Sequence, residues 1–117
     1  MPRRSAPQLP RQTEAQFMSS VLQYARLRRW RIFHDVATNT PRRCTGCGTF
    51  RRTPRNPAGL PDLILVRRPR VVWAELKAED GKVSEDQQAW LDDLGACGQE
   101  VFLWKPSDWD SILGVLL

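Results

Sequence analysis

Three charged residues are the part of this 117-residue chain whose types and spacing best suit chemistry. Asp62 opens one apolar run, and Glu75 and Lys77 close another. On a strand, side chains two positions apart share one face and lie roughly 7 Å apart, so Glu75 and Lys77 point to the same side. If the two runs pair, two carboxylates and one ammonium meet. Because unpaired buried charge is costly, this cluster predicts a hard divalent cation held by oxygens, a pattern typical of nucleases.

Four segments with strand-like patterns would position these groups, at residues 30–36, 62–66, 70–77 and 100–104. The second and third segments are joined by a short basic turn, Arg67-Arg68-Pro69-Arg70, which predicts a β-hairpin. That hairpin would bring Asp62 alongside Glu75.

Two helices begin with the same signal, a Ser or Thr followed by Gln at the third position after it. Thr13 with Gln16 and Ser84 with Gln87 both match the capping box. The first helix is expected to run to about Arg29, and the second to close at Gly95 and Gly98. Ser107 begins a short third helix.

The resulting order α-β-β-β-α-β-α predicts an α/β fold, a mixed four-stranded sheet flanked by helices. Residues 13–117 would form a single domain, preceded by a flexible basic arm at residues 1–12 and interrupted by a loop at residues 37–58.

Two polar residues on these helices have two open interpretations each. Glu14 lies three, four and seven positions before apolar residues of its helix. It either complements the positive end of the helix dipole or is a third carboxylate aimed at Asp62 and Glu75. Gln87 is either only the partner of the Ser84 cap or a polar group that reaches the same cluster.

The loop at residues 37–58 is rich in arginine, and no acidic residue lies between Thr38 and Pro61. Such a run is either a solvated surface or a clamp for DNA phosphates. The arginines expected to bind DNA are Arg42, Arg43, Arg51, Arg52 and Arg55.

The same loop contains Cys44 and Cys47 in a C-x-x-C arrangement, which resembles half of a tetrahedral zinc site. The remaining candidates, Cys97 and His34, do not obviously complete it. A second chain would supply another pair, and the alternative is a pair of reduced thiols.

The composition favours a soluble protein with a polyanionic partner. The net charge is +5, and most of the 18 Lys and Arg residues are arginine, which forks onto phosphates. No apolar run approaches the ~20 residues of a membrane span. The N-terminus does not resemble a secretory signal, and three cysteines give no disulfide framework. We therefore expect a cytoplasmic location, in a bacterial or phage-infected cell, and no small-molecule cofactor.

The order of elements and motifs resembles the PD-(D/E)xK nuclease superfamily, and more narrowly its VRR-NUC family, which includes Holliday-junction-resolvase-like proteins. The matching stretches are Gly59–Ile64, Glu75–Lys77 and Gly81–Gln87, with Glu14 in the opening helix. The loop at residues 38–57 is longer than the family pattern. The resemblance implies a restriction-endonuclease-like core.

The resemblance also implies roles for individual residues. Asp62, Glu75 and the Leu76 carbonyl would hold Mg²⁺ or Mn²⁺, assisted by Glu14. Lys77 would orient or deprotonate the attacking water, and Gln87 would position the lysine or the phosphate. The expected activity is cleavage of branched DNA, such as Holliday junctions, by a homodimer. The alternatives are cleavage of flaps, nicks or specific duplex sites, and an inactive DNA-binding module.

Overall fold

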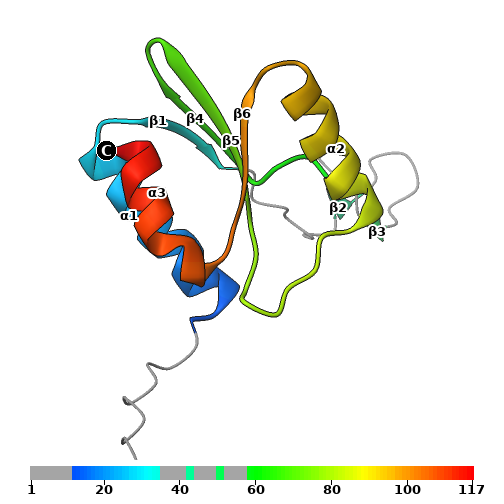
Figure 1. Cartoon of the computed structure of the whole chain (residues 1–117). Coiled ribbons are helices and arrows are strands. Elements are labelled where there is room, and N and C mark those ends of the chain that lie inside the picture. The colour runs from blue at the N-terminus through cyan, green and yellow to red at the C-terminus, as the bar shows by residue number, and fades with distance from the viewer. Residues whose placement is uncertain (1–11, 35–41, 44–49, 52–57) are drawn as a thin grey trace, which may run out of the picture.

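The structure is a computed structural model that describes residues 12–34, 42–43, 50–51 and 58–117 (Figure 1). Within those residues the expected order of helices and sheet strands is confirmed. The elements are α1 (Glu14–Leu27), β1 (Arg31–His34), β2 (Arg42–Arg43), β3 (Phe50–Arg51), β4 (Leu63–Arg67), β5 (Arg70–Leu76), α2 (Glu85–Ala96), β6 (Glu100–Trp104), the 3₁₀ turn η1 (Pro106–Asp108) and α3 (Trp109–Leu116).

The main sheet has four strands in the order β1-β4-β5-β6. The pairs β1–β4 and β4–β5 are antiparallel, whereas β5–β6 is parallel. Arg67 pairs with Arg70 across the turn of the β4–β5 hairpin, and the Arg68–Pro69 peptide is cis. The predicted mixed α/β sheet is therefore confirmed, and it is consistent with a restriction-endonuclease-like core.

Helices lie on both sides of this sheet, with α1 and α3 on one side and α2 on the other (Figure 1). The core lies between the sheet and the α1–α3 pair because alternate strand residues point there. It includes Leu63 and Leu65 from β4 and Val72, Ala74 and Leu76 from β5. Glu75 points to the opposite side, toward α2.

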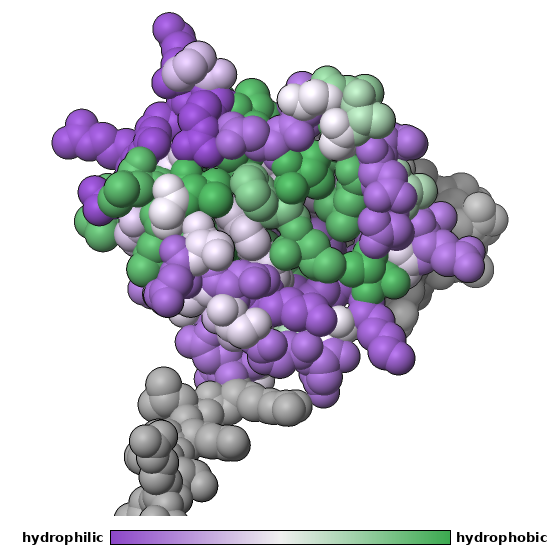
Figure 2. Space-filling view, in the orientation of Figure 1, coloured by the Kyte–Doolittle hydropathy of each residue, from purple (hydrophilic) through white to green (hydrophobic). Residues whose placement is uncertain are grey.

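The face of the sheet that carries Glu75 is less completely covered. Phe33 pairs with Ile64 on this face and is 53% exposed, and Leu103 pairs with Glu75 and is 38% exposed. No residue of α2 is fully buried. One side of the molecule shows a band of apolar surface between hydrophilic regions (Figure 2).

Both capping boxes are present as predicted. Thr13 Oγ1 accepts from the Gln16 amide while Gln16 Oε1 accepts from the Thr13 amide, and Ser84 and Gln87 do the same. Helix α2 ends between Gly95 and Gly98, the two glycines expected to close it. The helix continues to Ala96, and the left-handed conformation that ends it belongs to Gly98, with φ of 78°.

The loop at residues 37–58 contains one feature that the sequence did not predict. Strands β2 and β3 pair as a short antiparallel ribbon, with Arg42 opposite Arg51 and Arg43 opposite Phe50. The pairing is only two residues long in each strand and follows no hydrophobic alternation. Residues 37–41, 44–49 and 52–57 of this loop, and residues 1–11 of the predicted arm, lie outside the described part of the chain.

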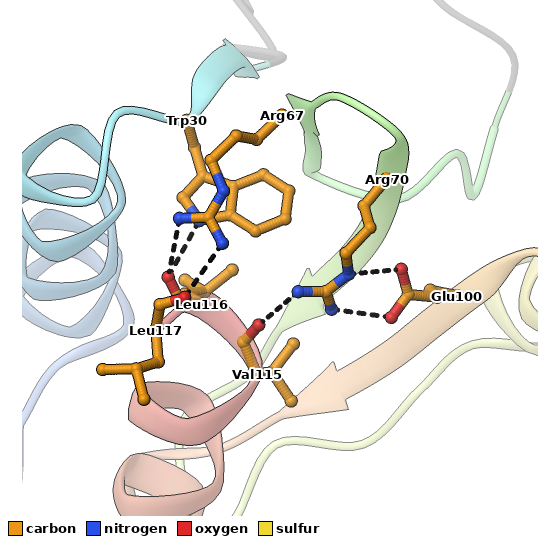
Figure 3. Close-up of polar contacts among 7 residues, drawn as sticks. All are labelled: Trp30, Arg67, Arg70, Glu100, Val115, Leu116 and Leu117. Carbon is orange, nitrogen blue, oxygen red and sulfur yellow. Dashed lines mark hydrogen bonds and ion pairs between the residues drawn. The ribbon is translucent and has the colours of Figure 1, made fainter.

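Two arginines of the basic hairpin turn are bound into the fold (Figure 3). Arg67 donates to the carbonyls of Arg28 and Leu117 at 2.9 Å each, and its guanidinium lies 4.4 Å from the centre of the Trp30 ring. Arg70 donates to the Val115 carbonyl at 2.8 Å and forms a two-point ion pair with Glu100. These contacts join the hairpin to the C-terminal end of α3.

Candidate active site

Asp62 and Glu75 meet where the β4–β5 ladder ends. The last paired residues are Leu63 and Ala74, so the next position places Asp62 opposite Glu75. There, side chains take over the hydrogen bonds of the ladder. The Asp62 amide donates to Glu75 Oε2 at 3.2 Å, and the Leu76 amide donates to Asp62 Oδ2 at 3.1 Å.

Two further side chains converge on Glu75. Gln87 Nε2, from the first turn of α2, donates to Glu75 Oε1 at 2.8 Å. The ammonium of Lys77 lies 3.7 Å from the same oxygen. The Glu75 side chain is only 2% exposed. In place of water, its carboxylate contacts the Asp62 backbone amide, the Gln87 side-chain amide and the Lys77 ammonium.

The structure thus brings together Asp62, Glu75, Lys77 and Gln87. Gln87 fits both of its interpretations at once, since its Oε1 completes the Ser84 cap while its Nε2 reaches Glu75. The two functions use opposite ends of one amide group.

The carboxylates of Asp62 and Glu75 repel each other, and this repulsion affects the pKa of Glu75. Burial raises the pKa of Glu75 to about 7, and the charge of Asp62 adds to the rise while that of Lys77 opposes it. Burial also raises the pKa of Asp62, against the hydrogen bond from the Leu76 amide and the charges of Lys77 and His34. A buried carboxylate, Glu75, and a half-buried one, Asp62, that repel each other favour the binding of a cation between them.

The segment before β4 positions Asp62 against α2. Gly59 has φ of 87°, a conformation that side chains rarely adopt. A Cβ on Gly59 would lie 2.5 Å from the backbone carbon of Asp86, so the two backbones are in direct contact. Pro61 is buried, and Trp90 Nε1 donates to the carbonyl of Ala58 at 3.2 Å.

Glu14 lies on the face of α1 that carries the buried stripe, but before the stripe begins. Its side chain is exposed, and the stripe begins at Phe17. The reason is its place in the first turn, at the very start of the helix. Among the described residues, no group of three or more His, Cys, Asp or Glu side chains is arranged to hold one metal ion. The dipole interpretation of Glu14 fits this position, and its role as a metal ligand stays a prediction.

The donor set at the cluster nevertheless fits a hard cation. Mg²⁺ is commonly held by one or two carboxylates, with water and substrate phosphate completing its shell. Asp62 and Glu75 supply those two carboxylates, and the predicted third ligand, the Leu76 carbonyl, belongs to the same strand end.

His34, which the sequence offers only as a zinc candidate, lies near the cluster. His34 is the last residue of β1 and pairs with Leu63, the residue that follows Asp62. Its charge lowers the pKa of Asp62. No short motif marks this neighbour, because it depends on the register of β1 against β4.

The other predicted sites fall largely outside the described residues. This holds for Cys44 and Cys47, and for Arg52 and Arg55. Arg42, Arg43 and Arg51 lie in β2 and β3, and their DNA contacts stay predictions. Cys97 is exposed and free at the end of α2.

Residues 12–106, which make up most of the chain, match the VRR-NUC domain family. The chain belongs to the VRR-NUC family. No curated protein and no solved structure shows significant similarity to it.

Membership in the VRR-NUC family identifies a nuclease-type, DNA-processing domain. The cluster of Asp62, Glu75, Lys77 and Gln87 is its candidate active site. In the part of the chain that the structure describes, no helix is long and apolar enough to cross a membrane.

Proposed function

We propose that this VRR-NUC protein is a Mg²⁺- or Mn²⁺-dependent endodeoxyribonuclease that hydrolyses phosphodiester bonds. The observation that supports it most strongly is the meeting of Asp62, Glu75 and Lys77 at the end of one hairpin. The net charge of +5 suits a polyanionic substrate.

The carboxylates of Asp62 and Glu75, with the Leu76 carbonyl, would hold the cation. When bound, it would polarise the phosphate and lower the pKa of coordinated water. Lys77 would stabilise charge on the phosphate and orient the attacking water. Its side chain is only 15% exposed, and its ammonium lies 3.7 Å from Glu75 Oε1.

Gln87 would restrain the Glu75 carboxylate. Because its Nε2 occupies Glu75 Oε1 at 2.8 Å while the Asp62 amide occupies Oε2, the carboxylate plane has little freedom to rotate. A ligand held in one orientation loses less entropy when it binds. Gln87 would thus act on the site from outside the coordination sphere.

For the substrate, we propose branched DNA, such as a Holliday junction, cut by a homodimer. Each chain has one candidate site, whereas symmetric resolution of a four-way junction needs two cuts. A dimer with twofold symmetry supplies two sites in matching positions. The arginines of the 37–58 loop would contact phosphates and thereby position the junction.

The deciding experiment is a cleavage assay with Mg²⁺ and with Mn²⁺. The substrates are a four-way junction, a flap, a nicked duplex, a linear duplex and single-stranded DNA, all of matched sequence. Lys77→Ala is the inactive control, and EDTA tests the need for metal.

Paired symmetric cuts confined to the junction, abolished by EDTA and by Lys77→Ala, are the expected result. Cleavage of flaps or plain duplex would retain the nuclease and overturn junction resolution. Tight binding without cleavage under either metal would overturn the enzyme and identify a DNA-binding module.

A further inference from the structure

The Gln87 amide is held at both ends, and this fixes which end faces the carboxylate. Its Oε1 accepts from the Ser84 backbone amide at 2.9 Å, and its Nε2 donates to Glu75 Oε1 at 2.8 Å. The reversed amide would place oxygen against a carboxylate and nitrogen against an N–H, so both contacts would become repulsive. The cap therefore selects the orientation in which Gln87 is a donor to Glu75.

The Ser84 hydroxyl holds the turn from which Gln87 projects. Ser84 Oγ accepts from the Gln87 backbone amide at 3.2 Å, which satisfies a donor that has no partner within the helix. The capped residue is the same residue whose side chain reaches the site. Any fraying of this turn would carry the Gln87 amide away from Glu75.

Gly59 fixes the same turn from the opposite side. Its backbone lies against Asp86 and Gln87, where a Cβ would come within 2.5 Å of Asp86 C and 2.7 Å of Gln87 N. Since Gly59 lies only three positions before Asp62, this contact ties the first turn of α2 to the segment that presents the other carboxylate.

We infer that Ser84 and Gly59 are positioning residues of the active site, which act through Gln87 to hold the Glu75 carboxylate in the orientation that binds the metal. This inference rests on the proposed function for its consequence in cleavage. The geometry of the amide is independent of that function.

The chain provides a matched control, because α1 starts with the same capping box. Thr13 and Gln16 make the same pair of hydrogen bonds at 3.1 and 2.9 Å, and Gln16 is exposed. Thr13→Ala removes a cap of the same kind from a helix whose cap residue contacts none of the four cluster residues in the described structure. Any general effect of cap loss on stability appears in both variants.

The experiment compares Ser84→Ala, Ser84→Thr and Thr13→Ala in the full chain. The readouts are Mn²⁺ affinity by calorimetry, cleavage rate as a function of Mn²⁺ concentration, and hydrogen exchange of the Gln87 side-chain NH₂ by NMR. We expect Ser84→Ala to weaken Mn²⁺ binding about 10-fold, as the loss of an outer-shell partner does. Faster exchange of the Gln87 NH₂ would accompany it.

Ser84→Thr keeps the cap, so the Mn²⁺ affinity and the exchange rate of the Gln87 NH₂ should stay as in the wild type. Thr13→Ala should also leave both unchanged. A second pair, Gln87→Glu and Gln16→Glu, keeps both boxes because Glu is an equally good partner there. Only Gln87→Glu exchanges a donor to Glu75 for a second carboxylate, so only it should change the Mn²⁺ affinity.

Equal effects of Ser84→Ala and Thr13→Ala would overturn the inference and leave Ser84 a helix cap alone. So would unchanged Mn²⁺ affinity in Ser84→Ala. If wild type binds Mn²⁺ but cuts no DNA, the proposed function fails, while the affinity and exchange measurements still test the positioning of Gln87.

Discussion

Asp62 and Glu75 lie directly opposite each other at the end of the β4–β5 ladder, and the Asp62 amide donates to Glu75 Oε2 at 3.2 Å. The backbone of Asp62 thus contacts the side chain of Glu75, and the side chain of Asp62 accepts from the backbone amide of Leu76, the residue after Glu75. The register of the two strands, rather than the rotamers of the two side chains, therefore sets the spacing of the two carboxylates.

The first prediction concerns the two carboxylates. Asp62→Asn and Glu75→Gln are expected to abolish cleavage while DNA binding is kept or tightened, because each change removes negative charge near the phosphates. Gel-shift and cleavage assays on the same junction measure both properties. Asp93→Asn, an exposed position on α2, is the control and should leave cleavage unchanged. Cleavage that survives either cluster substitution would contradict the site assignment.

The second prediction concerns stability and pH in the metal-free protein. The pKa of Glu75 is about 7 in the fold and 4.5 in the unfolded chain, so between these values only the folded state holds the proton. The free energy of unfolding should therefore fall as pH rises through this window, by at most about 3 kcal/mol. The raised pKa of Asp62 acts in the same direction.

Urea unfolding at pH 5 and pH 8 in EDTA measures this effect. Glu75→Gln is neutral throughout and should flatten the difference between the two pH values, whereas the exposed Glu85→Gln should not. A difference of the same size in Glu75→Gln would show that other groups cause it.

The third prediction concerns Arg67, which joins the hairpin to the end of α3. Arg67→Met should lower the free energy of unfolding by about 1 kcal/mol, because it removes the hydrogen bonds to the carbonyls of Arg28 and Leu117. Its neighbour Arg68 is exposed, so Arg68→Met is the matched control in chemical denaturation. If Arg67→Met and Arg68→Met lower the free energy of unfolding by the same amount, the contacts of Arg67 add nothing to stability.

The fourth prediction concerns the arginine loop. Arg51→Ala with Arg52→Ala should weaken DNA binding and reduce the slope of log K against log salt by about 1.8, if both residues contact duplex phosphates. Fluorescence anisotropy between 50 and 200 mM salt, roughly the range in which such contacts dominate, measures it. An unchanged slope would identify the loop as a solvated surface.

Much of the fold and of the site could be predicted because the deciding signals are local. Each capping box lies within four consecutive residues, and each strand face follows from period-two alternation. The meeting of Asp62 with Glu75 needed only the hairpin, which the turn at Arg67–Arg70 indicated. The resemblance to the VRR-NUC family also rested on short stretches, Gly59–Ile64, Glu75–Lys77 and Gly81–Gln87.

The features that the sequence did not reveal depend on long-range placement. The exposure of Glu14 follows from where α1 meets the sheet, and the neighbourhood of His34 from the register of β1. Arg67 and Arg70 belong to a segment that the sequence identifies only as a basic turn. Their hydrogen-bond partners are 39 to 50 positions away in sequence, with the exception of Glu100 at 30, so no local pattern indicates their structural role.

The active-site cluster is contained in residues 62–87, and its contacts to Glu75 span only 12 and 13 positions. Closing loops of this length costs little chain entropy compared with the contacts made by α3. We therefore expect the cluster to assemble early in folding, from the hairpin and the first turn of α2, before the two ends of the domain close over the core.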